Sequence, residues 1–288
     1  MNTSGPVDLP ELPPREPESH KGDYGRALLV GGSVGMTGAI GLSGAAALRS
    51  GAGLVTVATS APCLPVVAGY EPSYMTAALP ADEDGRISNA ARSVLKTFTA
   101  PATCVACGPG LGRSESLQRL VNWLYTTLSQ PAVFDADALY ALSADSDNLS
   151  RAAGPRVLTP HPGEFARLVP DAQQPTADLR QLAINAAAAW RVVVVLKGHH
   201  TLVTDGRQQF VNPSGNPGMA TGGTGDVLTG VITGLLCQQL EPFAAAQLGV
   251  YLHGLAGDMA AAEVGQTSLI ASDLLRFLPR AFQQHANS

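Results

Sequence analysis

Short apolar runs alternate with helix-like segments along most of this 288-residue chain, and that alternation constrains the fold more than any other feature. The run at residues 192–196, Val-Val-Val-Val-Leu, is apolar at every position, which is typical of a strand covered on both faces. Strand, helix and strand in succession form a βαβ unit, whose crossover makes the two strands parallel. The strands are predicted at residues 26–31, 54–58, 103–108, 131–135, 156–159 and 192–196. The pattern therefore predicts an α/β fold around a mostly parallel sheet.

Helical periodicity fills most of the intervals between these strands and dominates the end of the chain. The helices are predicted at residues 38–51, 114–128, 177–190, 225–236, 243–264 and 271–282. Residues 200–204 and 208–212, separated by Asp-Gly-Arg, predict a β-hairpin. No repeat and no flexible linker interrupts the series, and 45% hydrophobic residues are enough for a large core. We therefore expect an irregular Pro-rich arm at residues 1–19 and a single domain at residues 20–288.

Composition and charge argue against several classes of function. The formal net charge is -5 and the 18 basic residues are scattered, which argues against a nucleic-acid-binding surface. No apolar run is long enough to span a bilayer, and no secretory signal is visible. Cys104 and Cys107 form a Cys-x-x-Cys that a redox site or half a zinc site would use, but they stand in an apolar run without a second such pair. We expect these two cysteines to be core residues and the protein to be cytoplasmic.

The most informative stretch is the glycine-rich segment at residues 212–230, which holds six glycines in nineteen residues and leads into an apolar helix face. A glycine loop entering a helix N-terminus binds anions, because backbone N–H groups converge there and the helix dipole is positive. Asp226 stands at that position. It could simply cap the helix, or it could take the proton from a hydroxyl that attacks phosphorus. The density of glycines favours the second interpretation, although the Gly-x-x-x-x-Gly-Lys-Ser/Thr pattern of a P-loop is absent.

Two strand ends supply further candidates. Ligands of open parallel sheets bind at the carboxyl ends of the strands, and Lys197 directly follows the apolar run at residues 192–196. The alternative is a surface lysine at a turn. His161 lies in the segment Leu-Thr-Pro-His-Pro-Gly-Glu, where two prolines restrict the loop in a way that suits a substrate contact; a solvent-exposed loop histidine is the alternative. The adjacent His199 and His200 lack the partners of a metal site.

Three other segments follow predicted strands. The glycines of residues 108–112 allow a ligand to approach the backbone closely. Asp135 and Asp137 could bind magnesium through water, orient a ribose or cap the helix that follows. Residues 31–38 resemble a dinucleotide-binding loop, but Gly-x-Gly-x-x-Gly is not met and no acidic residue closes the second strand.

Taken in order, these segments resemble the ADP- or ATP-dependent NAD(P)H-hydrate dehydratases of the ribokinase-like superfamily. The matching segments are residues 20–26, 30–33, 50–54, 108–112, 135–139, 158–164, 196–198 and 222–226. The resemblance implies a three-layer α/β/α fold with a central, mostly parallel sheet. It also implies a substrate, which is NADH or NADPH with water added across a double bond of the nicotinamide ring.

The activity that the resemblance implies is a dehydration driven by phosphoanhydride cleavage, a repair of the damaged nucleotide. ADP phosphorylates the added hydroxyl, phosphate leaves and the double bond returns. Asp226 would act as the catalytic base. The residues implied to bind the nucleotide are Lys197, Gly198, His199, His200, Thr201 and Gly225. The residues implied to contact the hydrated dinucleotide are Ala39, Gly110, Gly112, His161 and Asp226.

The resemblance also implies cofactors and partners. Family members act with magnesium, and bacterial ones resemble homotetramers. In many relatives an epimerase domain precedes the dehydratase, whereas only about twenty irregular residues precede the matching region here. We therefore expect a stand-alone dehydratase of the ADP-using branch, which receives the correct epimer spontaneously or from a separate NAD(P)H-hydrate epimerase.

Two other functions fit the same residues. A small-molecule kinase of the superfamily, such as a hydroxyethylthiazole or sugar kinase, would use Asp226 identically but release the phosphorylated alcohol. The segment at residues 158–164 favours the dehydratase. A nucleotide-binding sensor or regulatory subunit would keep its affinity for nucleotide without turnover.

Overall fold

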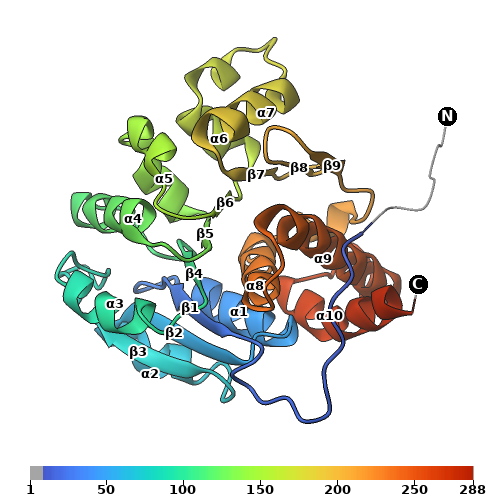
Figure 1. The fold of residues 1–288 in the computed structure, drawn as a ribbon, viewed down its shortest axis with the longest axis horizontal. Coiled ribbons are helices and arrows are strands. Elements are labelled where there is room, and N and C mark those ends of the chain that lie inside the picture. The colour runs from blue at the N-terminus through green and yellow to red at the C-terminus, as the bar shows by residue number, and fades with distance from the viewer. Residues whose placement is uncertain (1–8, 288) are drawn as a thin grey trace.

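One sheet of nine strands runs through the centre of the part of the chain that the computed structural model describes, residues 9–287 (Figure 1). The strands are β1 (Arg26–Val30), β2 (Leu54–Ser60), β3 (Met75–Leu79), β4 (Cys104–Cys107), β5 (Ala132–Phe134), β6 (Arg156–Leu158), β7 (Val193–Leu196), β8 (Leu202–Thr204) and β9 (Gln209–Val211). Their order in the sheet is β3-β2-β1-β4-β5-β6-β7-β8-β9. The pairs from β3 to β7 are parallel, and β7, β8 and β9 are antiparallel. The expected mostly parallel sheet and the hairpin at its end are confirmed.

Helices cover both faces of this sheet and complete the three predicted layers. They are α1 (Thr37–Arg49), α2 (Leu64–Ala68), α3 (Ala91–Thr99), α4 (Glu115–Thr127), α5 (Asp137–Ser143), α6 (Pro162–Leu168), α7 (Leu179–Trp190), α8 (Thr224–Cys237), α9 (Pro242–Val264) and α10 (Ala271–Ala286). Neighbouring residues of β1 point to opposite sides: Leu29 packs with Ile40 of α1, and Leu28 packs in the core on the other face. One core joins α1, α8, α9 and α10, and the other joins α3 to α7 (Figure 1).

The strand order reverses between β1 and β4. From β1 the chain continues to β2 and β3 on one side, then returns to β4 on the other side of β1. Such a reversal leaves a crevice at the carboxyl ends of the two strands, where open α/β sheets bind their ligands. The loops that leave β1 and β4 are joined here, because the Gly32 N–H donates to the Pro109 carbonyl at 2.9 Å and the Ser33 hydroxyl donates to the Gly110 carbonyl at 2.9 Å.

Helices α1 and α8 pack directly against each other where glycines of α8 leave no room for a side chain. A Cβ placed on Gly230 would lie 2.2 Å from the Ser43 carbonyl oxygen, and one on Gly234 would lie 2.7 Å from the Ala47 carbonyl oxygen. Residue numbers rise together along both helices, so the helices run parallel and begin at the same end of the sheet. Their first turns therefore lie side by side at the mouth of the crevice.

Other expectations can be compared directly with the described residues. Cys104 and Cys107 are buried in β4, as predicted. Residues 9–19 of the predicted arm contain no helix or strand, and residues 1–8 lie outside the described part. The arm contacts the body of the molecule, since Arg15 donates to the Gly51 carbonyl at 2.8 Å. Among the described helices, none combines the length and hydropathy of a membrane span.

Candidate active site

A cavity of about 510 Å³ opens beside the first turn of α8. It is lined by the β7–β8 loop, by the glycine-rich loop before α8 and by one face of α9. All six residues expected to bind the nucleotide contribute to its wall: Lys197, Gly198, His199, His200, Thr201 and Gly225. The structure thus brings together residues that are separated in sequence, while their role in nucleotide binding stays a prediction.

The N-terminus of α8 carries no side-chain cap. The helix follows Gly223, whose φ of 94° is left-handed and which has no side chain to accept a hydrogen bond from the first turn. The first N–H groups of a helix have no partner within the helix. By contrast, the Ser114 hydroxyl accepts from the Leu117 N–H at the start of α4. The donors of the α8 N-terminus are therefore available to an anion in the adjoining cavity.

Asp226 lies in this first turn, where its carboxylate faces a group of other charges. Partial burial, followed by the negative charge of Asp135, raises the pKa of Asp226 from 3.8 to about 7, against the opposing effect of Lys197. No described residue forms a hydrogen bond with its carboxylate. Such a group exchanges protons near neutral pH, which is the property required of a general base.

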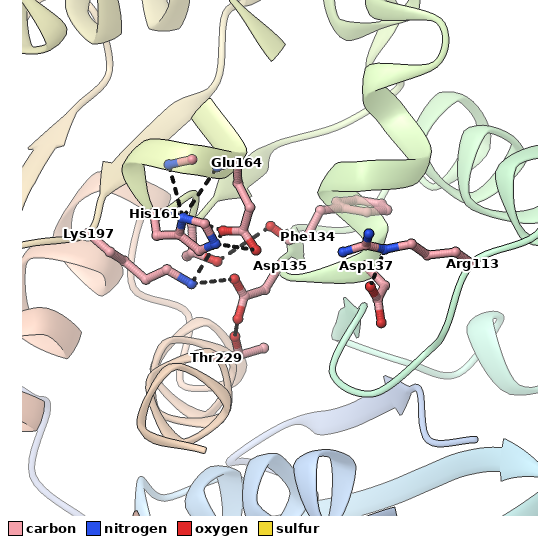
Figure 2. Close-up of polar contacts among 10 residues, drawn as sticks. Arg113, Phe134, Asp135, Asp137, His161, Glu164, Lys197 and Thr229 are labelled. Carbon is pink, nitrogen blue, oxygen red and sulfur yellow. Dashed lines mark hydrogen bonds and ion pairs between the residues drawn. The ribbon is translucent and has the colours of Figure 1, made fainter. Parts of the chain in front are cut away.

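Lys197 is not the surface lysine of the alternative interpretation. Its Nζ lies 2.8 Å from Oδ1 of Asp135 and 3.8 Å from an oxygen of Glu164, and its side chain is 20% exposed (Figure 2). Thr229 of α8 donates to the other Asp135 oxygen at 2.7 Å. Burial favours the neutral forms of both partners, but their mutual attraction outweighs it: the pKa of Asp135 is lowered and that of Lys197 is raised. Lys197 therefore remains an ammonium beside the cavity.

Asp137 serves a different purpose from Asp135. One of its oxygens accepts from the Gly112 N–H at 2.9 Å. The other accepts from Arg113 Nε at 3.2 Å (Figure 2). It stabilises the loop after β4 and does not cap α5, whose preceding residue, Ala136, supplies no side-chain cap either. The interpretation in which Asp135 or Asp137 caps the following helix is therefore wrong.

His161 caps α6. Its Nδ1 accepts from the N–H groups of Gly163 and Glu164 at 3.0 and 3.3 Å, while Glu164 accepts from the His161 N–H at 2.8 Å (Figure 2). Because Nδ1 is an acceptor, the neutral ring carries its proton on Nε2. The side chain is 53% exposed, so Nε2 can still reach a ligand. The expected rigid histidine is present, and it is a helix cap as well.

The other residues expected to contact the dinucleotide lie across α8 from the cavity. A Cβ on Gly110 would be 3.2 Å from the Ala39 Cβ, so these two loops touch. The Ser43 hydroxyl lies 3.1 Å from the Ala39 carbonyl and 2.8 Å from the Asp226 carbonyl, and can donate its proton to either. The Gly112 N–H donates to Asp137, and the negative charge of Asp137 contributes to the raised pKa of Asp226. Ala39, Gly110 and Gly112 therefore lie together after β1 and β4, and Ser43 of α1 connects this region to the backbone of Asp226.

A family comparison accounts for this arrangement. The family model described as NAD(P)H-hydrate dehydratase matches residues 27–280. The chain belongs to this family. The ADP-dependent (S)-NAD(P)H-hydrate dehydratase of Bacillus subtilis is 37% identical over 281 residues, which are 95% of this chain and 94% of that protein. The bifunctional NAD(P)H-hydrate repair enzyme of Moorella thermoacetica is 48% identical over 93% of this chain, and the chain spans 51% of its length. The chain thus spans about half the length of such curated relatives.

Comparison with solved structures gives matches that are consistent with membership of the NAD(P)H-hydrate dehydratase family. A crystal structure of the Bacillus subtilis ADP/ATP-dependent NAD(P)H-hydrate dehydratase, co-crystallised with ATP and magnesium, matches with a TM-score of 0.79 and 35% identity, covering 95% of this chain and 94% of that one. A hydroxyethylthiazole kinase from Pyrococcus horikoshii matches with a TM-score of 0.62 and 20% identity, covering 89% and 88%, which shows a common fold. The family match supports the dehydratase interpretation over the kinase alternative.

Several residues of this dehydratase-family site were not predicted from the sequence. His253 of α9 lines the cavity, and its Nε2 lies 2.8 Å from the Thr224 carbonyl. Burial lowers the pKa of His253 to about 4, so it is neutral and donates through Nε2. Asp258 of α9 accepts hydrogen bonds from the glycine-rich loop. Both are polar residues in a largely apolar helix, but the groups they bind lie in other segments of the chain, so the sequence pattern of α9 does not assign them to this site.

Proposed function

We propose that the chain catalyses the ADP-dependent dehydration of hydrated NADH and NADPH. The observation that supports this most directly is the position of Asp226. Its carboxylate, with a pKa of about 7, stands at an uncapped helix N-terminus between a nucleotide-sized cavity and the loops of the β1–β4 crevice. A base between a phosphoryl donor and a hydroxyl acceptor is the arrangement that phosphorylation of an alcohol requires.

In this proposal the reaction has two steps. Asp226 takes the proton of the added hydroxyl as its oxygen attacks the terminal phosphorus of ADP, and the bond from phosphorus to the AMP oxygen breaks. The N–H groups of the α8 first turn and the Lys197 ammonium stabilise the phosphoryl oxygens. The carbon–oxygen bond then breaks, phosphate leaves with that oxygen, a proton is lost from the neighbouring carbon, and the ring double bond re-forms. Hydroxide is a poor leaving group and phosphate a good one, which is why the phosphorylation is needed.

The residues in the two proposed ligand sites follow from the same arrangement. We assign Lys197, Gly198, His199, His200, Thr201 and Gly225 to the nucleotide. We assign Ala39, Gly110, Gly112, His161 and Asp226 to the hydrated dinucleotide. The assignment of the first set is supported by its place in the cavity wall. In the second set, Ala39, Gly110 and Gly112 lie after β1 and β4, and His161 follows β6.

Magnesium fits this site as a partner of the nucleotide. Among residues 9–287 there is no cluster of three or more His, Cys, Asp or Glu side chains of the kind that binds a metal. Magnesium commonly keeps several waters and uses one or two carboxylates together with substrate phosphates. The oxygens of Asp135 are occupied by Lys197 and Thr229. One oxygen of Glu164 accepts from the His161 N–H. This leaves Asp226 and the other oxygen of Glu164 among the carboxylates beside Lys197. When bound, the metal would neutralise phosphate charge there.

The activity is tested by incubating the protein with hydrated NADH or NADPH, magnesium and either ADP or ATP. Recovery of the absorbance of the reduced nicotinamide, with ADP giving the faster rate, supports the proposal. Accumulation of a stable phosphorylated dinucleotide would instead support a kinase. Tight nucleotide binding without turnover of any of the four pairings would support a regulatory protein.

The assembly and setting are proposals of the same kind. We infer a single domain at residues 20–288, a homotetramer, a cytoplasmic location, and cooperation with a separate NAD(P)H-hydrate epimerase. Light scattering tests the tetramer, and addition of an epimerase to a mixture of both epimers tests the cooperation. With the epimerase present, the dehydratase should convert the whole mixture more quickly.

A further inference from the structure

One part of the wall of the cavity beside α8 is a loop, residues 212–219, that forms no helix or strand over most of its length. Six residues between 212 and 219 line the cavity, yet this segment contains just one short 3-10 turn, Pro217–Met219. A loop of this kind can form a binding surface only if other elements hold it in place. The β7–β8 loop holds the first residue of this segment, since the Asn212 N–H donates to the Thr201 carbonyl at 2.9 Å. Most of the segment's other hydrogen bonds to the described chain come from α9 and from the start of α8.

Helix α9 holds this loop along a single face. The Asn212 amide donates to the Val250 carbonyl at 3.0 Å, and the Ser214 hydroxyl donates to the Tyr251 carbonyl at 2.9 Å. One turn further along, glycine allows the loop to lie against the helix, because a Cβ on Gly254 would meet the Ser214 Oγ at 2.2 Å. The loop therefore lies directly on the helix backbone.

Asp258 completes this attachment with a charged acceptor. Its two oxygens accept separately from consecutive loop residues: Oδ2 accepts from the Gly215 N–H at 2.9 Å, and Oδ1 accepts from the Asn216 amide at 2.9 Å. Gly215 has a left-handed φ of 100°, and Asn216 in turn accepts from the Gly218 N–H at 3.0 Å. Hydrogen bonds to a charged acceptor are the stronger ones, and this pair fixes both the backbone and a side chain of the cavity wall.

We propose that Asp258 is a positioning residue for the nucleotide: it holds residues 215–218 against α9 so that this loop forms the cavity wall. Asp258 itself is not among the residues that line the cavity, so it acts through the loop. The inference rests on the proposed function, because it takes the nucleotide to be the occupant of this cavity. It predicts that losing the carboxylate weakens nucleotide binding and leaves the dinucleotide side of Asp226 unchanged.

The test is Asp258→Asn, which keeps the shape of the side chain but replaces one acceptor oxygen with a donor. Isothermal titration with ADP and magnesium should show a Kd raised about tenfold, as expected for loss of a charge-assisted hydrogen bond. In steady-state assays the KM for ADP should rise similarly, with kcat at saturating ADP and the KM for the hydrated dinucleotide within about twofold of the parent. Asp258→Glu retains a carboxylate and should recover most of the affinity.

Asp178→Asn is the matched control, because Asp178 also accepts two hydrogen bonds, from the N–H groups of Arg180 and Gln181, but at the start of α7, away from the cavity. It should leave the Kd for ADP unchanged. Equal Kd values for Asp258→Asn and the parent would overturn the positioning role, as would an equal rise in both KM values. If the parent itself fails to bind ADP, the proposed function fails first, and the two failures are therefore distinguishable.

Discussion

A carboxylate in the first turn of a helix is ordinarily held in its charged form by the helix dipole. At Asp226 other influences outweigh this one, since partial burial and the nearby negative charge of Asp135 raise its pKa to about 7. The Asp135 carboxylate shows the opposite shift, because the charge of Lys197 lowers its pKa. Two carboxylates within one site are thus separated into a structural anion and a proton acceptor, which is a common division of roles in active sites.

The pH dependence of turnover follows from this pKa. Because the proton acceptor must be ionised, kcat/KM should fall as the pH drops below about 7, and level off above it. Asp226→Asn should lower kcat by roughly 100-fold or more, since general base catalysis contributes about 10² to 10⁴. Rate measurements from pH 5 to pH 9 check both, with ADP affinity measured to confirm that the variant still binds. A profile that rises toward acid would contradict the assignment.

The same raised pKa predicts an effect on stability. In the unfolded chain Asp226 regains its ordinary value of 3.8, so between about pH 4 and pH 7 the folded protein binds more protons and its stability falls as the pH rises. The cost at pH 8 amounts to up to about 4 kcal/mol. Asp226→Asn should therefore raise the melting temperature at pH 8 and have little effect at pH 4. Thermal melts of both proteins at the two pH values provide the measurement, and a variant less stable at pH 8 would refute the burial of a charge.

A single site residue can be predicted from the sequence when the pattern that marks it lies in the neighbouring residues. Asp226 was found because six glycines surround it in sequence. The partner of Lys197 is Asp135, which lies 62 residues away just after another strand, so this pairing depends on sheet order, which local patterns do not contain. His253 and Asp258 do not follow from the sequence because the groups they bind, at the start of α8 and in the loop before it, lie 29 to 43 residues away in the chain.

At the level of elements, the contact of α1 with α8 connects the two sides of the site. Their parallel packing places Ser43 where its hydroxyl reaches the Asp226 carbonyl at 2.8 Å. The close approach depends on Gly230, which lies within van der Waals contact of the α1 backbone. Any side chain at this position would force the helices apart and move Asp226 relative to the β1 loop.

Gly230→Ala is expected to destabilise the protein. Its new Cβ would lie 2.2 Å from the Ser43 carbonyl oxygen, and overpacking of this kind costs about 1–3 kcal/mol. Gly38→Ala in α1 is the control, because the nearest atom to its Cβ is the Tyr70 hydroxyl at 3.6 Å, and alanine favours a helix over glycine by up to about 1 kcal/mol. Urea denaturation should therefore separate the two variants in opposite directions. Equal stabilities would show that the helix contact can relax.

Elements with strong periodicity were predicted, and those with weak patterns were not. The strands of the sheet centre and the three C-terminal helices match the expectation within a few residues. The sequence pattern predicts no element between residues 61 and 100, although this segment forms α2, β3 and α3. Strand β3, Met-Thr-Ala-Ala-Leu, lies at the sheet edge and has two alanines, which have low strand propensity, so its structure depends on pairing with β2.

Across the whole molecule, strand order locates the chemistry. Neither the position of β4 beside β1 nor the resulting crevice is present in local sequence patterns, because pairing between distant strands is decided by the complete sheet. The fold places the nucleotide-sized cavity and the crevice on the two sides of α8. Both proposed ligands therefore contact an element whose residues 227–237 are buried in the core.

Ligand binding at such a central element should stabilise the entire fold. A ligand that binds only the folded state adds about 2.7 kcal/mol at a concentration of 100 times its Kd. For a protein of this size that corresponds to a rise in melting temperature of about 5–10 °C. We expect ADP with magnesium to produce such a rise in the parent protein, measured by differential scanning calorimetry.

The matched variant for this experiment is Gly225→Val. A Cβ at position 225 would lie 3.4 Å from Lys197 Nζ, and a branched side chain there would extend into the cavity that Gly225 lines. The first turn of a helix tolerates valine, so the melting temperature without ligand should change little. The rise with ADP should disappear, because the phosphates can no longer approach the α8 N–H groups. If ADP stabilised the variant as much as the parent, the nucleotide would have to bind outside the cavity beside α8.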